Sequence, residues 1–137
     1  MSTSVREFES ISEFLKSVDE AISEYRKRLG ELLRKLEELR VKAEQEKKLR
    51  AVLSKLGLSE TTVANEVALR NVRIVVNPTA MQELAAMEAA AEALNNKVAL
   101  LTAVRKELEI LGGIEVGAKL SVVYVDDVPR TIVLRLY

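Results

Sequence analysis

The sequence predicts an α+β fold in which a long coiled-coil helix, a short strand, a second long helix and a C-terminal β-hairpin follow one another. Apolar residues recur at intervals of three and four over residues 8–43 and again over 80–108, which is the periodicity of packed helices. Residues 119–136 are instead rich in β-branched side chains. We therefore divide the chain into a long helix (1–57), a linker with a short strand (58–78), a second helix (79–111) and a hairpin (112–137). Together they form one structural domain with an extended helical arm.

Composition narrows the possible functions. The 21 Lys and Arg residues balance the 21 Asp and Glu residues, so net charge draws the chain neither to nucleic acid nor to a membrane. Cysteine and histidine are absent, which removes thiolate chemistry, the commonest general base and the usual transition-metal ligands. We expect no enzyme, no cofactor and no metal site. Apolar runs are too short for a membrane helix, so we expect a cytoplasmic protein, and the charged, cysteine-free composition suits a thermophile.

Residues 5–56 predict the first helix, with five consecutive heptads that are apolar at every a and d position up to Ala43. Its start is open between Ser4 and Ser10, since each serine precedes a glutamate by three residues. Glu46 interrupts the pattern, and Gly57 has the position of a glycine C-cap. We predict that the apolar stripe is an oligomerisation seam. Its residues are Phe8, Ile11, Leu15, Val18, Ile22, Tyr25, Leu29, Leu32, Leu36 and Leu39.

Charge is unevenly distributed along this helix. Residues 1–24 carry six acidic and two basic side chains, a net charge of −4, whereas residues 25–55 carry eleven basic and five acidic ones, a net charge of +6. A parallel pair of such helices would place like charges together, and an antiparallel pair would place opposite charges together. We therefore expect antiparallel helix packing.

The linker and second helix follow. Residues 59–70 are compatible with either a loop or a short helix, and the β-branched stretch 71–76 predicts a strand. Thr79 and Gln82 have the spacing of a capping box that opens the second helix, which we expect to end near Leu111, before two glycines. The alanine-rich face of this helix continues the seam with Leu84, Met87, Ala91, Leu94, Val98 and Leu101.

The C-terminal hairpin is predicted from two strands, 119–125 and 131–136, joined by the turn-forming stretch 126–130. Asp126 and Asp127 could together bind a divalent cation, but adjacent acids in such a stretch more often serve as turn formers. Apolar residues occupy both faces of the first strand. Because an isolated hairpin is not stable, we expect it to be buried or paired.

Two resemblances bear on function. The heptads up to Ala43, the alanine-rich second helix, the terminal sequence VVYVDDVPRTIVLRLY and the thermophile-like composition resemble arcadins, small coiled-coil accessory proteins of the crenarchaeal actin-like cytoskeleton. Two helices with a small β element also resemble prefoldin, an archaeal and eukaryotic holdase. A prefoldin subunit, however, ends in a helix, whereas this chain ends in a strand. Neither resemblance carries over any functional residue.

We expect a non-enzymatic, homo-oligomeric coiled-coil scaffold or adaptor that binds itself and an unidentified protein partner, in an archaeal cytoskeleton if the arcadin resemblance holds. A prefoldin-like chaperone is one alternative. A nucleic-acid-associated protein is the other, although interspersed acids and the lack of an aromatic platform make nucleic acid an unlikely partner. It would use a basic cluster on the first helix, namely Arg26, Arg28, Lys35, Arg40, Lys42, Lys47, Lys48 and Arg50.

Overall fold

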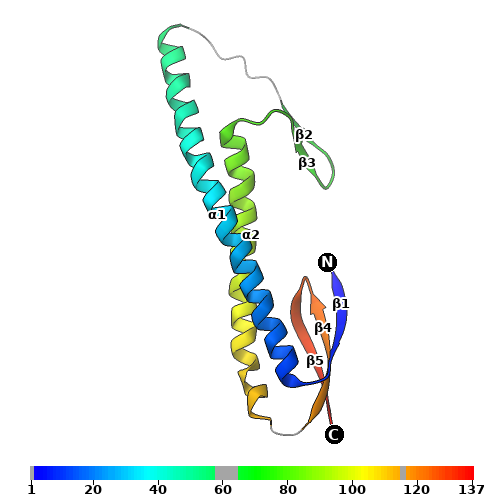
Figure 1. Ribbon diagram of the computed structural model, residues 1–137. Coiled ribbons are helices and arrows are strands. Elements are labelled where there is room, and N and C mark those ends of the chain that lie inside the picture. The colour runs from blue at the N-terminus through cyan, green and yellow to red at the C-terminus, as the bar shows by residue number, and fades with distance from the viewer. Residues whose placement is uncertain (1, 58–64, 115–116) are drawn as a thin grey trace. The chain divides into compact units, whose positions relative to one another are not determined.

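A computed structural model of the chain describes residues 2–57, 65–114 and 117–137 and confirms the α+β class (Figure 1). The elements are β1 (Thr3–Phe8), α1 (Ile11–Lys55), β2 (Glu66–Ala68), β3 (Arg73–Val75), α2 (Ala80–Glu107), the 3₁₀ helix η1 (Leu108–Gly113), β4 (Ala118–Val125) and β5 (Val128–Leu136). The chain divides into unit 1, formed by residues 1–29 and 93–137, and unit 2, formed by residues 30–92. Among the described residues, no helix is long and apolar enough to cross a membrane.

Unit 1 contains an antiparallel three-stranded sheet in the order β1-β4-β5. The predicted hairpin is confirmed as β4 and β5, but the predicted connection 126–130 is too long, because β5 already begins at Val128 and leaves a turn of two residues. Asp126 and Asp127 form this turn with φ angles of 50° and 66°. Positive φ at both central residues is the geometry of a type I′ turn, whose twist matches that of the flanking strands, and aspartate tolerates it well.

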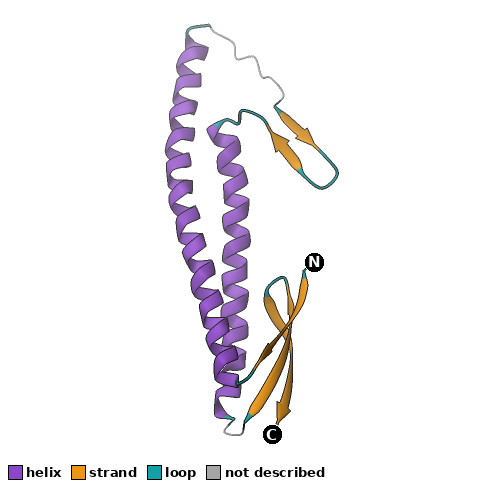
Figure 2. Cartoon of the chain, turned by 45° about the vertical axis from the view of Figure 1, so that its right-hand side comes forward, coloured by secondary structure: helices purple, strands orange, loops and turns teal. Residues whose placement is uncertain are grey.

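The core of unit 1 lies between one face of this sheet and the first half of α1, with residues from α2 and η1 (Figure 2). Leu120, Val122 and Tyr124 alternate along β4 and point into it. Phe8 and Phe14 contact each other there, with ring centroids 5.2 Å apart. The core is completed by Val18, Ile22, Leu101, Leu108 and Val128. The helices thus cover one face of the hairpin.

The predicted start of the first helix is wrong, because residues 3–8 form strand β1. Ser10 resolves the two possible starts, since its Oγ accepts a hydrogen bond from the Glu13 backbone N–H at 3.0 Å and α1 begins at the next residue. A residue before the cap cannot continue the helix. Phe8 matched the heptad spacing by position, yet it reaches the same core from a strand paired with Leu120.

Within unit 1, α1 and α2 run antiparallel. Arg105 on α2 binds Asp19 on α1 with an Nε to Oδ1 distance of 2.8 Å, and Lys97 on α2 lies 5.2 Å from the centre of the Tyr25 ring on α1. Increasing residue numbers on one helix therefore meet decreasing numbers on the other. This is packing within one chain, whereas the antiparallel packing expected from charge concerned copies of the first helix and stays a prediction.

Unit 2 holds the second part of α1 and the first part of α2. The predicted capping box is confirmed, because Thr79 Oγ1 accepts from the Gln82 N–H at 3.2 Å while Gln82 Oε1 accepts from the Thr79 N–H at 3.0 Å. Glu46 explains the interruption of the heptads. Its two carboxylate oxygens accept the buried Ala80 N–H at 3.0 and 3.1 Å, so a charged side chain from α1 caps the start of α2.

Two further boundaries differ from the predictions. The second helix leaves α geometry at Glu107 and continues as η1 to Gly113 instead of ending near Leu111. The predicted strand 71–76 is shorter, Arg73–Val75, and pairs with β2 from the stretch that was compatible with a loop or a short helix. Residues 59–64 of that stretch lie outside the described residues. At the end of α1, Gly57 adopts a φ of 81°, which confirms the glycine C-cap.

Candidate interaction surface and polar cleft

The sixteen predicted seam residues are all covered at least in part within the single chain. Phe8, Val18, Ile22, Leu36, Leu39, Ala91 and Leu101 are buried, and Ile11, Leu15, Tyr25, Leu29, Leu32, Leu84, Met87, Leu94 and Val98 are half-buried. All except Phe8 lie on α1 or α2. Much of the seam is thus used for packing inside the chain, and its role between copies stays a prediction.

An exposed apolar surface lies elsewhere, on the hairpin formed by β2 and β3. In this antiparallel register Val67 pairs with Ile74, and Leu69 donates its backbone N–H to Val72 across the turn. Paired residues of such a hairpin share one face. Five apolar side chains therefore lie on the same face with exposures of 45–62%, and we call this surface the apolar hairpin face: Val67, Leu69, Val72, Ile74 and Val76.

Unit 2 as a whole exposes more large apolar residues than it buries. Its described buried apolar residues are Leu36, Leu39, Ala43, Ala80 and Ala91. Besides the apolar hairpin face, it exposes Leu33, Val41, Leu49, Val52, Leu56 and Met81. A two-stranded hairpin is at best marginally stable alone in water, and concentrated apolar exposure marks interaction surfaces. Unit 2 therefore has the apolar exposure that is typical of an interaction surface.

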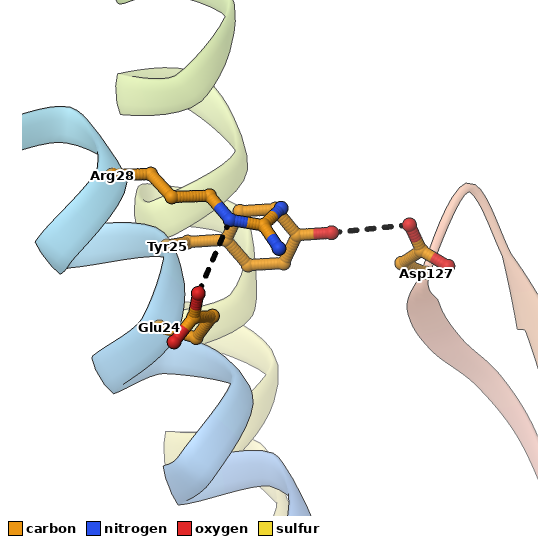
Figure 3. A network of polar contacts seen from close by, with 4 residues as sticks. All are labelled: Glu24, Tyr25, Arg28 and Asp127. Carbon is orange, nitrogen blue, oxygen red and sulfur yellow. Dashed lines mark hydrogen bonds and ion pairs between the residues drawn. The ribbon is translucent and has the colours of Figure 1, made fainter. Parts of the chain in front are cut away.

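A polar cleft of about 230 Å³ lies in unit 1, bordered by β1, the first half of α1 and the β4–β5 turn. One wall is a network around Tyr25 (Figure 3). The Tyr25 hydroxyl donates to Asp127 Oδ2 at 3.0 Å, and the Arg28 guanidinium lies 5.4 Å from the centre of the Tyr25 ring. Glu24 Oε1 accepts from Arg28 Nε at 3.3 Å. This network ties α1 to the turn between β4 and β5.

Arg6 and Tyr124 also line the cleft. The Arg6 guanidinium carbon lies 5.1 Å from the centre of the Phe8 ring and 5.7 Å from that of Tyr124, and one guanidinium nitrogen donates to Ser17 Oγ at 3.5 Å. Among the described residues Arg6 forms no ion pair. Tyr124 is 7% exposed, and its buried hydroxyl has no hydrogen-bond partner of acceptable geometry.

Both tyrosines favour their protonated forms. Burial raises the pKa of Tyr25 above 10.0, and the hydrogen bond to the negatively charged Asp127 raises it further. Burial also raises the pKa of Tyr124, against the opposing effects of the Arg6 charge and of hydrogen-bonding contact with the Ser17 and Arg6 side chains. The two phenols are thus neutral hydrogen-bonding groups at ordinary pH. In the part of the chain that the structure describes, no cluster of three or more metal-ligating side chains occurs.

Sequence reasoning missed three features of these surfaces. Phe14, which is fully buried, lies outside the a and d positions because the sheet packs against a second face of α1. The cleft was not predicted, because most of the residues of β1 were assigned to the first helix. The predicted strand 71–76 contains three of the five residues of the apolar hairpin face, but its partner strand was not predicted. The alternation from Glu66 to Leu69 was the signal for that strand.

Comparison with known proteins identifies no relative from which a function could be inferred, so the inference must start from the surfaces described above. No family model, curated protein or solved structure matches the chain. Fold and surface define an α+β protein with two long helices, an exposed apolar hairpin face in unit 2 and a polar cleft in unit 1.

Proposed function

We propose that this protein is a non-enzymatic, homo-oligomeric scaffold whose copies associate through unit 2. The observation that carries this proposal is the apolar hairpin face. Its five side chains would bury substantial apolar area against a partner, and each hairpin would gain the packing that two strands cannot supply. We assign the seam mainly to holding the two helices of each chain together.

A second copy of the chain suits this face. The face carries no ionisable side chain, so it can lie against its own copy without bringing like charges together. Arg73 and Glu66 project on the other side of the hairpin. Two such hairpins packed face to face would resemble a small sandwich with strands about 10 Å apart.

A paired substitution tests this assembly. Val67→Glu with Ile74→Lys places opposite charges across the two strands, which preserves hairpin pairing while removing the apolar contact. We expect the wild type to be an oligomer and this variant a folded monomer, as measured by light scattering and circular dichroism at micromolar concentration. Ala68→Glu, on the other side of the hairpin beside Arg73, is the matched control and should remain oligomeric. A monomeric wild type, or a double variant of wild-type mass, would contradict the proposal.

The prefoldin-like holdase remains the second candidate, because the same exposed apolar face could bind unfolded chains. The two functions differ in one assay, the suppression of aggregation of an unrelated unfolded protein. A scaffold does not suppress aggregation. A holdase does so, and Val67→Glu with Ile74→Lys would abolish the suppression even where the mass of the assembly is unchanged.

The cellular setting is also part of the proposal. We propose a cytoplasmic protein and, following the resemblance to arcadins, a cytoskeletal filament as the larger partner that the scaffold serves. Cell fractionation tests the first statement. Cosedimentation of the purified chain with filaments from an archaeon that has an actin-like cytoskeleton tests the second, and the chain is expected in the pellet only when filaments are present.

A further inference from the structure

The cleft in unit 1 has the size of a binding site for a small organic molecule. Its volume of about 230 Å³ exceeds the roughly 150 Å³ of an engineered protein cavity that holds benzene. Polar and apolar side chains both line it, the apolar ones being Val18, Ala21 and Pro129. A ligand that fits must therefore combine a polar group with a short apolar body.

The two cations and two anions that line the cleft balance in number, but one of the cations has no ion pair among the described residues. Glu24 is paired with Arg28, and Asp127 accepts from Tyr25 and lies 3.9 Å from Lys97 Nζ. Arg6 alone among the charged lining residues has no counter-ion in the described chain. Its guanidinium is nevertheless held in position by Ser17 and by the two aromatic rings of Phe8 and Tyr124. A positioned guanidinium with free donors is suited to bind an oxyanion.

The Tyr124 hydroxyl supplies a second donor beside this cation. It is buried, Ser17 and Arg6 lie close to it without forming a hydrogen bond of acceptable geometry, and burial raises its pKa above 10.0. A buried polar group without a partner is unfavourable, and a ligand that accepts its proton removes that penalty. Arg6 is an exposed residue whose guanidinium carbon lies 5.7 Å from the centre of the Tyr124 ring, so both donors border the same cleft.

We propose that this cleft binds a small monocarboxylate. The carboxylate pairs with the Arg6 guanidinium and accepts from the Tyr124 hydroxyl, while its short apolar body packs against Val18, Ala21 and Pro129. A singly charged anion is favoured over a doubly charged phosphate, because the carboxylates of Glu24 and Asp127 also line the cleft. This site is separate from the proposed assembly through unit 2 and does not depend on it.

Ligand-observed saturation-transfer NMR on the full chain tests the proposal, with sodium butyrate as the probe and 1-butanol as its uncharged counterpart. We expect saturable transfer to butyrate and none above background to butanol. Arg6→Gln should weaken butyrate binding by about tenfold or more, and Tyr124→Phe by about three- to tenfold. Arg26→Gln makes the same change on α1 at a residue that does not line the cleft, so it should bind as the wild type does.

Three results would overturn the assignment: equal transfer to butyrate and butanol, displacement of butyrate by inorganic phosphate at lower concentration than by acetate, or unchanged binding in folded Arg6→Gln. Circular dichroism establishes whether each variant is folded. Should Arg6→Gln fail to fold, Tyr124→Phe decides the question, because it alters one hydroxyl and leaves the ring in place. Unchanged butyrate affinity in that variant would then contradict the proposal.

Discussion

At the scale of single residues, the two tyrosines of the unit 1 cleft show how one side-chain type takes two roles. Tyr25 lies at the rim, where its hydroxyl is bonded to Asp127. Tyr124 lies inside, where its ring packs in the core and its hydroxyl forms no hydrogen bond of acceptable geometry. Their hydroxyls should therefore contribute to stability with opposite signs, and this difference can be measured.

Tyr124→Phe is expected to raise the free energy of unfolding by about 1 kcal/mol, because it removes a buried hydroxyl without a partner and keeps the ring. Tyr25→Phe is expected to lower it by less than about 1 kcal/mol, since a partly exposed hydrogen bond is lost. Urea denaturation followed by circular dichroism measures both. A loss of stability in Tyr124→Phe would mean that the hydroxyl has a favourable contact in the folded chain.

Alkaline pH should destabilise the fold through the same two residues. Both have folded-state pKa values above the ordinary 10.0, so the folded chain retains protons that the unfolded chain releases. Stability contributed in this way is complete below pH 10 and is lost as pH rises through the folded pKa values. Above pH 10 the wild type should lose stability more steeply than the Tyr25→Phe/Tyr124→Phe variant. Equal slopes in denaturation measured from pH 9 to 11 would contradict this.

At the scale of elements, the sequence predicted the two long helices and the C-terminal hairpin well because each is a long, regular pattern. Elements that depend on distant partners were harder to predict. Strand β1 is stabilised by pairing with β4, and nothing in its own six residues indicates that it pairs with a strand more than 100 residues away. The cleft was likewise not predictable, since it combines β1, α1 and the β4–β5 turn. The local periodicity of a segment shows which of its faces is apolar. It does not show which residues from elsewhere in the chain cover that face.

Glu46 tests this distinction at the junction of two elements. Heptad reasoning treats it as a defect, and Glu46→Leu would restore the apolar pattern. We expect Glu46→Leu instead to destabilise the fold by about 1–3 kcal/mol, because the buried Ala80 N–H loses its acceptor. Glu46→Gln keeps an acceptor and should cost less. If Glu46→Leu proves more stable than the wild type in urea denaturation, the cap has no energetic value.

At the scale of the whole molecule, the distribution of apolar residues differs between the two units and supports the proposed assembly through unit 2. Unit 1 covers its sheet with helices and buries ten residues in one core. Unit 2 leaves the apolar hairpin face open. A charged substitution in the core and one on that face should therefore have different outcomes, unfolding in the first case and dissociation in the second.

Deletion of residues 129–137 tests the contribution of β5 to unit 1. It removes the strand paired with β4 and exposes both the new strand edge and the side chains that Ile132 and Leu134 help to cover. We expect insoluble protein. The matched control lacks only Tyr137, which is 76% exposed, and should stay soluble. Fractionation of lysates after expression distinguishes them, and a soluble deletion variant with unchanged mass would show that β5 is dispensable for folding.

The register of β1 against β4 has a consequence for how the chain folds during its synthesis. Thr3 pairs with Val125 and Phe8 with Leu120, so contacts of the greatest sequence separation close this sheet. Residues 118–125 must emerge from the ribosome before β1 can pair with β4. Residues 30–92 emerge earlier and include every described residue of unit 2. Refolding should accordingly include a slow step that reports on β1, and a nascent chain stalled before residue 118 should leave Phe8 accessible to a chaperone.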